Sequence, residues 1–167
     1  MQTPICEVCL KSEFLCKACQ EKLDKGEISK SDVEVSRFLF KLSKKMKSIR
    51  NVKIVKVIDS GALIIITGRG DAAKLVGKGG SVVKKIAKQY KKPIRILEEA
   101  SDFRKFVEEL IFPATLYGIN TLYRNEEEIY RVRVPSLQKN HLMITPKDFS
   151  KVISEFFNMK AELIFES

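Results

Sequence analysis

The chain has 167 residues, of which 44% are hydrophobic and 31% are charged, so it can form one ordinary domain or two or three small ones. This composition is that of a globular chain and excludes wholesale disorder. No apolar run approaches the roughly 20 residues that cross a bilayer, and residues 1–10 lack the charged and apolar regions of a signal peptide. We therefore expect a cytoplasmic protein with no membrane partner.

The formal net charge of +10 indicates a polyanionic partner, and its distribution indicates where that partner binds. Residues 72–97 carry eight basic side chains and no acidic one. Residues 98–167 carry nine basic side chains against twelve acidic ones. We expect a polyanion to dock at residues 72–97, although a solvated lysine-rich helix face would have the same composition.

All four cysteines lie in residues 1–28, a segment with little helical or strand periodicity. They form two pairs, Cys6-x-x-Cys9 and Cys16-x-x-Cys19, and each pair can present two thiolates to one metal ion. A segment this short buries little core, so a metal would hold it folded. It resembles small zinc-ribbon or zinc-knuckle modules, which implies a structural Zn²⁺. Rubredoxin-like iron is the main alternative, whereas a redox disulfide pair fits a reducing cytoplasm poorly.

A second segment, residues 31–98, has a regular order of predicted elements. Ser31 and Glu34 have the spacing of a capping box, and apolar residues continue at helical spacing as far as Ile49. Asp71 and Ser81 are expected to cap two further helices. The elements after the first helix are expected at residues 52–58 (strand), 63–67 (strand), 71–76 (helix), 81–90 (helix) and 94–97 (strand). The order is therefore α-β-β-α-α-β.

The tetrapeptide Gly77-Lys78-Gly79-Gly80 lies between the last two predicted helices. Glycines permit unusual backbone angles and let a sugar–phosphate backbone approach the main chain closely. The free N–H groups of the next helix add a partial positive field, and Lys78 adds a mobile cation. Unstacked bases would need an apolar groove, which we expect from Leu75, Val76, Val82, Ile86 and the strand at residues 63–66.

The run from Leu75 to Ile86, after a β-hairpin and before a strand, resembles the KH domain. The element order resembles its type II, prokaryotic arrangement, as in NusA-type transcription factors. The resemblance covers residues 31–98 and implies a surface for about four nucleotides of single-stranded RNA. It implies as RNA-binding residues Arg69, Lys74, Gly77, Lys78, Gly79, Gly80, Ser81, Lys84, Lys85 and Lys88. The alternatives are a structural turn and a DNA-reading helix-turn-helix, whose second helix would usually carry polar base-reading side chains.

Residues 99–167 repeat most of this order without a glycine loop. The elements are expected at residues 103–111 (helix), 116–123 (strand), 129–134 (strand), 145–156 (helix) and 161–165 (strand), with a turn at residues 124–128. Ser136–His141 stands where a glycine loop would lie. We interpret the segment as a degenerate KH-like copy with a structural or protein-contacting role. Arg131 and Arg133 alternate along one strand; we expect a solvent-facing row, and the alternative is that they contact phosphate.

The sequence offers no catalytic constellation. His141 is the only histidine, and no nucleophile, acid and base converge in the pattern. The fold class expected is α+β: a four-cysteine zinc module, a type II KH domain and a degenerate KH-like domain, which together resemble an archaeal NusA-like KH protein. We expect non-enzymatic binding of single-stranded RNA, in transcription elongation or termination or in RNA processing. The alternatives are an adaptor that docks on RNA polymerase or the ribosome, and a DNA-binding factor.

Overall fold

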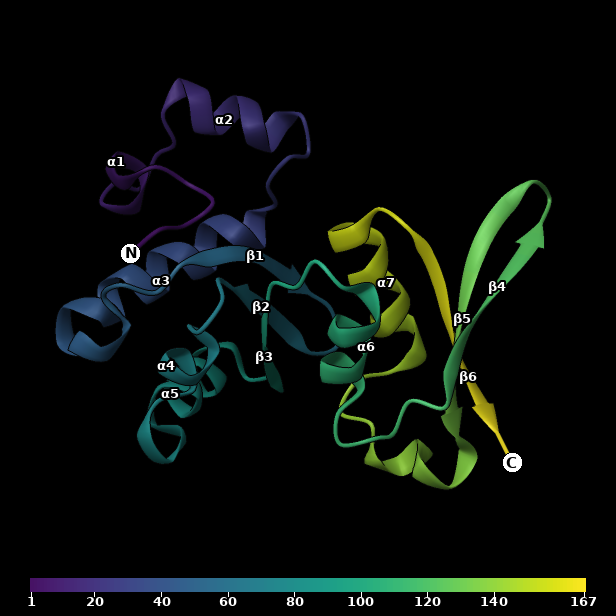
Figure 1. The fold of residues 1–167 in the computed structure, drawn as a ribbon. Helices are drawn as coiled ribbons and strands as arrows, with labels where there is room; N and C mark the ends of the chain where they lie inside the picture. Colours follow the sequence, from purple (N-terminus) through teal and green to yellow (C-terminus); the bar gives the residue numbers. More distant parts are fainter. The chain divides into compact units, whose positions relative to one another are not determined.

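Two three-stranded sheets, each accompanied by helices, make up most of the regular structure (Figure 1). The computed structural model describes all of residues 1–167. The chain forms two compact units: the first contains Met1–Asp59 and Leu63–Glu99, and the second contains Ser60–Ala62 and Ala100–Ser167. The expected α+β class is confirmed. None of the helices combines the length and the apolar character that crossing a membrane requires.

The N-terminal segment contains more helix than its sequence indicates. Two short helices, α1 (Glu7–Leu10) and α2 (Lys17–Asp24), each begin directly after the first cysteine of a pair. The segment packs against the next helix, α3 (Lys30–Lys45), through a small core formed by Ile5, Cys9, Leu10, Cys19, Ile28 and Val33. Arg37 of α3 adds a hydrogen bond from its Nε to the carbonyl oxygen of Cys9, at 3.0 Å. The cysteine segment therefore rests on α3.

Helix α3 begins earlier than predicted, because its capping box uses Ser29 and Asp32 instead of Ser31 and Glu34. The Asp32 carboxylate accepts the Ser29 N–H at 2.8 Å, and the Ser29 hydroxyl accepts the Asp32 N–H at 3.1 Å. The other Asp32 oxygen accepts the backbone N–H of Val57 at 2.6 Å, which ties the helix to the first sheet. The helix ends at Lys45, earlier than predicted, and a separate 3₁₀ turn, η1 (Lys47–Ile49), follows.

The first sheet contains β1 (Ile54–Asp59), β2 (Leu63–Thr67) and β3 (Ile94–Glu98) in that spatial order. Strand β2 pairs antiparallel with β1 and parallel with β3. One face of the sheet packs against α3, α4 (Ala72–Val76) and α5 (Ser81–Tyr90) through a buried core. Parallel neighbours need a crossover connection, and here that connection consists of α4, the glycine segment and α5. The crossover therefore places the glycine segment at a junction between two packed helices.

The second unit repeats this strand arrangement. Its sheet contains β4 (Gly118–Arg124), β5 (Glu127–Pro135) and β6 (Lys160–Glu166), and β5 pairs antiparallel with β4 and parallel with β6. Its helices are α6 (Phe103–Ile111) and α7 (Pro146–Phe157), and the 3₁₀ helix η3 (Ser136–His141) precedes α7. The rings of Phe103, Phe106, Phe156 and Phe157 lie edge to face or stacked, with centroids 5.0–5.3 Å apart.

The β4–β5 turn is shorter than the five residues predicted, since the two strands pair up to Arg124 and Glu127. Only Asn125 and Glu126 remain in the turn, and both have positive φ, at 50° and 64°. Two central residues with positive φ are characteristic of a type I′ turn, whose twist matches that of the flanking strands. The hairpin is consequently longer and more regular than the sequence indicated.

Candidate functional site

The glycine segment has one position where a side chain cannot fit. Gly77 ends α4 with φ 80° and ψ 166°, a backbone region that glycine alone occupies readily. A Cβ at this position would lie 2.6 Å from Cγ2 of Val82 and 2.9 Å from its backbone nitrogen. Gly77 thus lets the start of α5 pack closely against the end of α4.

The other two glycines leave room for a Cβ. Gly79 and Gly80 both have left-handed backbone angles, with φ of 63° and 75°. A Cβ on Gly79 would have no heavy atom within 4 Å, and one on Gly80 would meet only Val83 and the end of Lys84, at 3.6 and 3.7 Å. The outer side of this turn, η2 (Lys78–Gly80), therefore exposes main chain to any ligand that approaches it.

Helix α5 begins directly after this turn in the sequence, and no side chain caps its N-terminus. Its N-cap residue is Gly80, so Ser81 does not act as the predicted cap. Asp71 also gives α4 no side-chain cap; its carboxylate instead accepts the Lys53 N–H at 3.0 Å and pairs with Lys74 at 3.3 Å. The first turn of α5 leaves N–H groups without a side-chain acceptor, and such groups favour a phosphate or other anion.

The predicted basic residues lie on consecutive elements around this turn. Lys74 is on α4, Lys78 is in the turn, and Arg69 lies between β2 and α4. Helix α5 carries the other three predicted lysines, at positions 84, 85 and 88. All six side chains are exposed, and Lys74 is the one that pairs with a carboxylate. The structure thus groups uncompensated basic side chains near an open main-chain turn.

The prediction of an apolar groove is wrong for most of the residues that it named. Leu75, Val82 and Ile86 are fully buried, as is every residue of β2, so none of them can contact a base. The exception is Val76, the residue before Gly77, which is 37% exposed. Helical and strand periodicity identified these residues as apolar faces, but Leu63, Ile65, Leu75, Val82 and Ile86 belong to the core that packs under α4 and α5.

The four cysteines lie together as their spacing predicted. Their Sγ atoms are all within 4.8 Å of one another, and Cys6 Sγ lies 3.4 Å from Cys9 Sγ and 3.8 Å from Cys16 Sγ. A tetrahedral ion with metal–sulfur bonds of about 2.3 Å would separate its sulfurs by about 3.8 Å. Backbone N–H groups of Cys6, Cys16 and Cys19 donate to three of the sulfurs, at 3.0–3.4 Å. The donor set and its spacing fit one tetrahedral ion.

The thiols differ in how readily they ionise. The Cys16 sulfur accepts the Cys19 N–H, which lowers the pKa of Cys16 to about 7. Burial raises the pKa of Cys9 to about 12 and also raises that of Cys19. Thiolates are the form that binds a metal, and a bound cation would stabilise the buried pair as thiolates.

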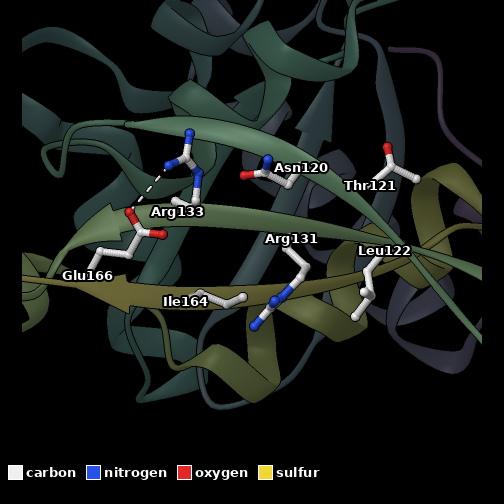
Figure 2. Close-up of a pocket in the computed structure, with 7 residues that line it drawn as sticks. All are labelled: Asn120, Thr121, Leu122, Arg131, Arg133, Ile164 and Glu166. Atoms are coloured by element: carbon white, nitrogen blue, oxygen red, sulfur yellow. Dashed lines mark hydrogen bonds and ion pairs between the residues drawn. The ribbon is translucent and has the colours of Figure 1, made fainter.

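A hollow that the sequence did not predict lies on the second sheet. Asn120, Thr121, Leu122, Arg131, Arg133, Ile164 and Glu166 line a hollow of about 360 Å³ across β4, β5 and β6 (Figure 2). Arg131 and Arg133 are half-buried and were expected to form a solvent-facing row. Strand alternation correctly placed the two arginines on one face, but it carries no information on how deeply they are buried.

The fold described above has two sheets, each with one antiparallel and one parallel strand pair, and a similar fold is found among solved structures. The crystal structure of APE1850 superposes with a TM-score of 0.58 over 76% of this chain and 96% of that chain, at 21% sequence identity. This likeness concerns the fold alone.

One curated protein is similar in sequence. It is the probable transcription termination protein NusA of Methanocaldococcus jannaschii, which is 32% identical over 71 residues. The matched region spans 42% of this chain and 39% of that protein. The sequence matches none of the described protein-family models.

Proposed function

We propose that residues 31–98 form a type II KH domain and that the chain binds single-stranded RNA through the turn at Gly77–Gly80. The observation that carries this proposal is the open main chain at Gly79 and Gly80, directly before the uncapped start of α5. A phosphate that reached this turn would find backbone N–H groups, the helix dipole and the Lys78 ammonium. Single-stranded RNA is the polyanion that KH domains bind in this way.

Further support comes from charge and from the similarity in sequence. Lys84 reaches over the turn, because its Cε lies 3.7 Å from where a Cβ on Gly80 would be. Val76 offers an exposed apolar side chain beside the turn, to which the face of an unstacked base can bind. The partial match to a probable transcription termination protein favours a role in transcription elongation or termination. The proposed role involves no catalysis and takes place in the cytoplasm.

The test is the double substitution Lys78→Asp with Gly79→Asp. Gly79 has open space around it, and aspartate is one of the residues that tolerate left-handed backbone angles, so the fold should persist. Two carboxylates would then face the phosphates, and affinity for a single-stranded RNA should fall by at least about tenfold. Fluorescence anisotropy with a labelled oligonucleotide would measure this. Undiminished affinity in the folded double variant would refute the site.

A matched control exists in the same unit. Lys25 and Gly26 are also an exposed Lys-Gly pair, and Gly26 has φ 76° with no heavy atom within 4 Å of a Cβ. Lys25→Asp with Gly26→Asp makes the same change in net charge at a similar backbone position. This variant should keep its affinity within about twofold. An equal loss in both variants would mean that only total charge matters.

We propose zinc as the ion of the cysteine site, in a structural role. Four protein thiolates would leave no open position for a substrate, which is the pattern of structural sites. The sulfur separations and the N–H donors to the sulfurs support this assignment. Iron remains the alternative ion for the same four ligands.

The second candidate function is protein docking, on RNA polymerase or the ribosome. It is favoured by the surface of the cysteine segment, where Val8 and Phe14 are 70% and 80% exposed. Residues 1–28 carry four lysines against five acidic residues, so their charge does not favour RNA. In this case partners would stay bound after nuclease treatment, and the double variant at Lys78 and Gly79 would keep them. For a DNA-binding factor, duplex DNA would outcompete single-stranded RNA.

A further inference from the structure

The hollow on the second sheet lies on the face opposite its helices. Along β5, Val132 and Val134 are fully buried, whereas Arg131 and Arg133 alternate with them and point to the other face. In register, Arg131 stands between Asn120 of β4 and Glu162 of β6. Arg133 stands between Gly118 and Ile164. Residues opposite one another share a face, so both arginines and Asn120 line the same hollow, with Arg133 extending toward β4 and Arg131 toward β6 (Figure 2).

Arg133 is held in place by its surroundings. Its Nη1 donates to Oε2 of Glu166 at 3.3 Å (Figure 2). Its Nη2 occupies the space that a Cβ on Gly118 would need, so the guanidinium group lies against bare backbone. Any larger residue at position 118 would displace it. Arg133 therefore lines the hollow in a fixed position, and its positive charge is paired with Glu166.

Arg131 has no such partner. It forms no ion pair, and its Nε is buried without a hydrogen-bond acceptor, as is the Nε of Arg133. Of the two carboxylates nearby, Glu166 pairs with Arg133, and Glu162 lies 3.9 Å from Arg124. Glu162 stands opposite Arg131 in register, and its Oε1 is itself buried without a hydrogen-bond donor. Three guanidinium groups against two carboxylates leave Arg131 as the excess charge on this face. A buried donor without an acceptor is costly, and an acceptor from a ligand would offset that cost.

We infer that this hollow is a second nucleic-acid contact, in which Arg131 binds a backbone phosphate of single-stranded RNA. A guanidinium group presents its donors in a fork that matches a phosphate. Asn120, opposite Arg131 in register, adds an amide donor and acceptor to the lining of the hollow, while Leu122 and Ile164 give it apolar surface for a ribose or a base. The site goes beyond the proposed function, because it lies wholly in the second unit and does not use the glycine turn.

The test compares Arg131→Gln with Arg124→Gln in the full chain. Both remove one positive charge from the same sheet, but Arg124 does not line the hollow and already has a partner. We expect Arg131→Gln to weaken binding of a single-stranded RNA about fivefold and to make the log–log salt slope shallower by about 0.7, the value for one phosphate contact. Arg124→Gln should change neither the affinity nor the salt slope measurably. Arg131→Lys, which keeps the charge without the fork, should recover the slope but only part of the affinity.

The same substitutions in the Lys78→Asp, Gly79→Asp background separate this inference from the proposed function. If only the glycine-turn variant loses affinity and Arg131→Gln has no effect in either background, the hollow is not an RNA site and the proposed function stands. If only Arg131→Gln loses affinity, the hollow stands and the proposed function fails. A polyglutamate peptide, which is a polyanion without phosphates or bases, serves as a competitor in the binding assay. Displacement of RNA by that peptide at equal charge concentration, or peptide binding that RNA cannot reverse, would overturn the assignment to nucleic acid.

Discussion

At the residue scale, Gly77 and Gly79 of the Gly77–Gly80 turn have different tasks. Gly77 combines a backbone conformation restricted to glycine with a neighbour, Val82, that leaves no room for a Cβ. Gly79 has a left-handed conformation that other residues adopt at a cost, and its Cβ position is open. The first glycine therefore maintains the fold, whereas the second keeps the surface free for a ligand.

Stability measurements should separate these two tasks. Gly77→Ala should lower the free energy of unfolding by about 2–4 kcal/mol, because it adds both backbone strain and overpacking against Val82. Gly79→Ala should cost only about 1–2 kcal/mol, the strain of a left-handed residue with a Cβ. Urea denaturation followed by circular dichroism would measure both. Equal costs for the two substitutions would contradict the close contact at Gly77.

At the scale of elements, Asp32 connects a helix to a sheet. Its carboxylate is almost fully buried, completes the capping box of α3 and accepts the Val57 N–H of β1. Lys56 of β1 lies 3.8 Å away and supplies a compensating charge. One side chain thus fixes both the start of α3 and its position on β1.

Removal of this carboxylate should have a larger effect than the loss of an ordinary cap. Asp32→Ala is expected to lower the free energy of unfolding by about 2–4 kcal/mol, because it removes the cap and leaves a buried N–H without an acceptor. Glu34→Ala, at the position that the sequence indicated for the cap, should change it by less than about 0.5 kcal/mol, since Glu34 is exposed. Thermal or urea unfolding of both variants checks this. If Glu34→Ala lowered the free energy of unfolding as much as Asp32→Ala, the capping box predicted from the sequence, Ser31 with Glu34, would be the correct one.

The elements themselves were largely predictable, and their exact ends were not. Ser29-x-x-Asp32 and Ser31-x-x-Glu34 both satisfy the capping pattern, and only the contact of Asp32 with β1 decides between them. The groove was misjudged for a similar reason. Periodicity identifies apolar faces, but whether a face is core or binding surface depends on what packs over it, and β2 is buried along its whole length. By contrast, the glycine turn and the cysteine pairs depend on local spacing, which can be read from the sequence, so both could be predicted.

At the scale of the whole molecule, two units share one strand arrangement and differ in what their crossovers carry. The crossover of the first sheet contains the open glycine turn and is strongly basic. The crossover of the second contains η3 and α7, without glycine. The second crossover therefore offers no glycine turn to a ligand, and Arg131, which forms no ion pair, lies on the sheet face. The repeated arrangement explains how a common fold could support two different modes of contact.

The cysteine segment is the part of the molecule whose folding we expect to depend on a metal. Its core contains six buried residues, of which two are cysteines, and three thiols already have backbone donors. Protein purified without chelators should contain about one zinc ion per chain, and Cys9→Ser should remove it. Ser12→Ala, a substitution between the two cysteine pairs that spares every thiol, should retain the metal. Elemental analysis by mass spectrometry measures the content and distinguishes zinc from iron.

Metal removal should also affect the two units differently. Val33 of α3 belongs to the same small core as Cys9 and Cys19, so loss of the ion should loosen α1 and α2 and weaken the start of α3. Hydrogen exchange in the metal-free protein should therefore become faster in residues 1–33, while β4, β5 and β6 keep their protection. Full protection of α2 in metal-free protein would mean that the cysteine segment folds on its apolar contacts alone.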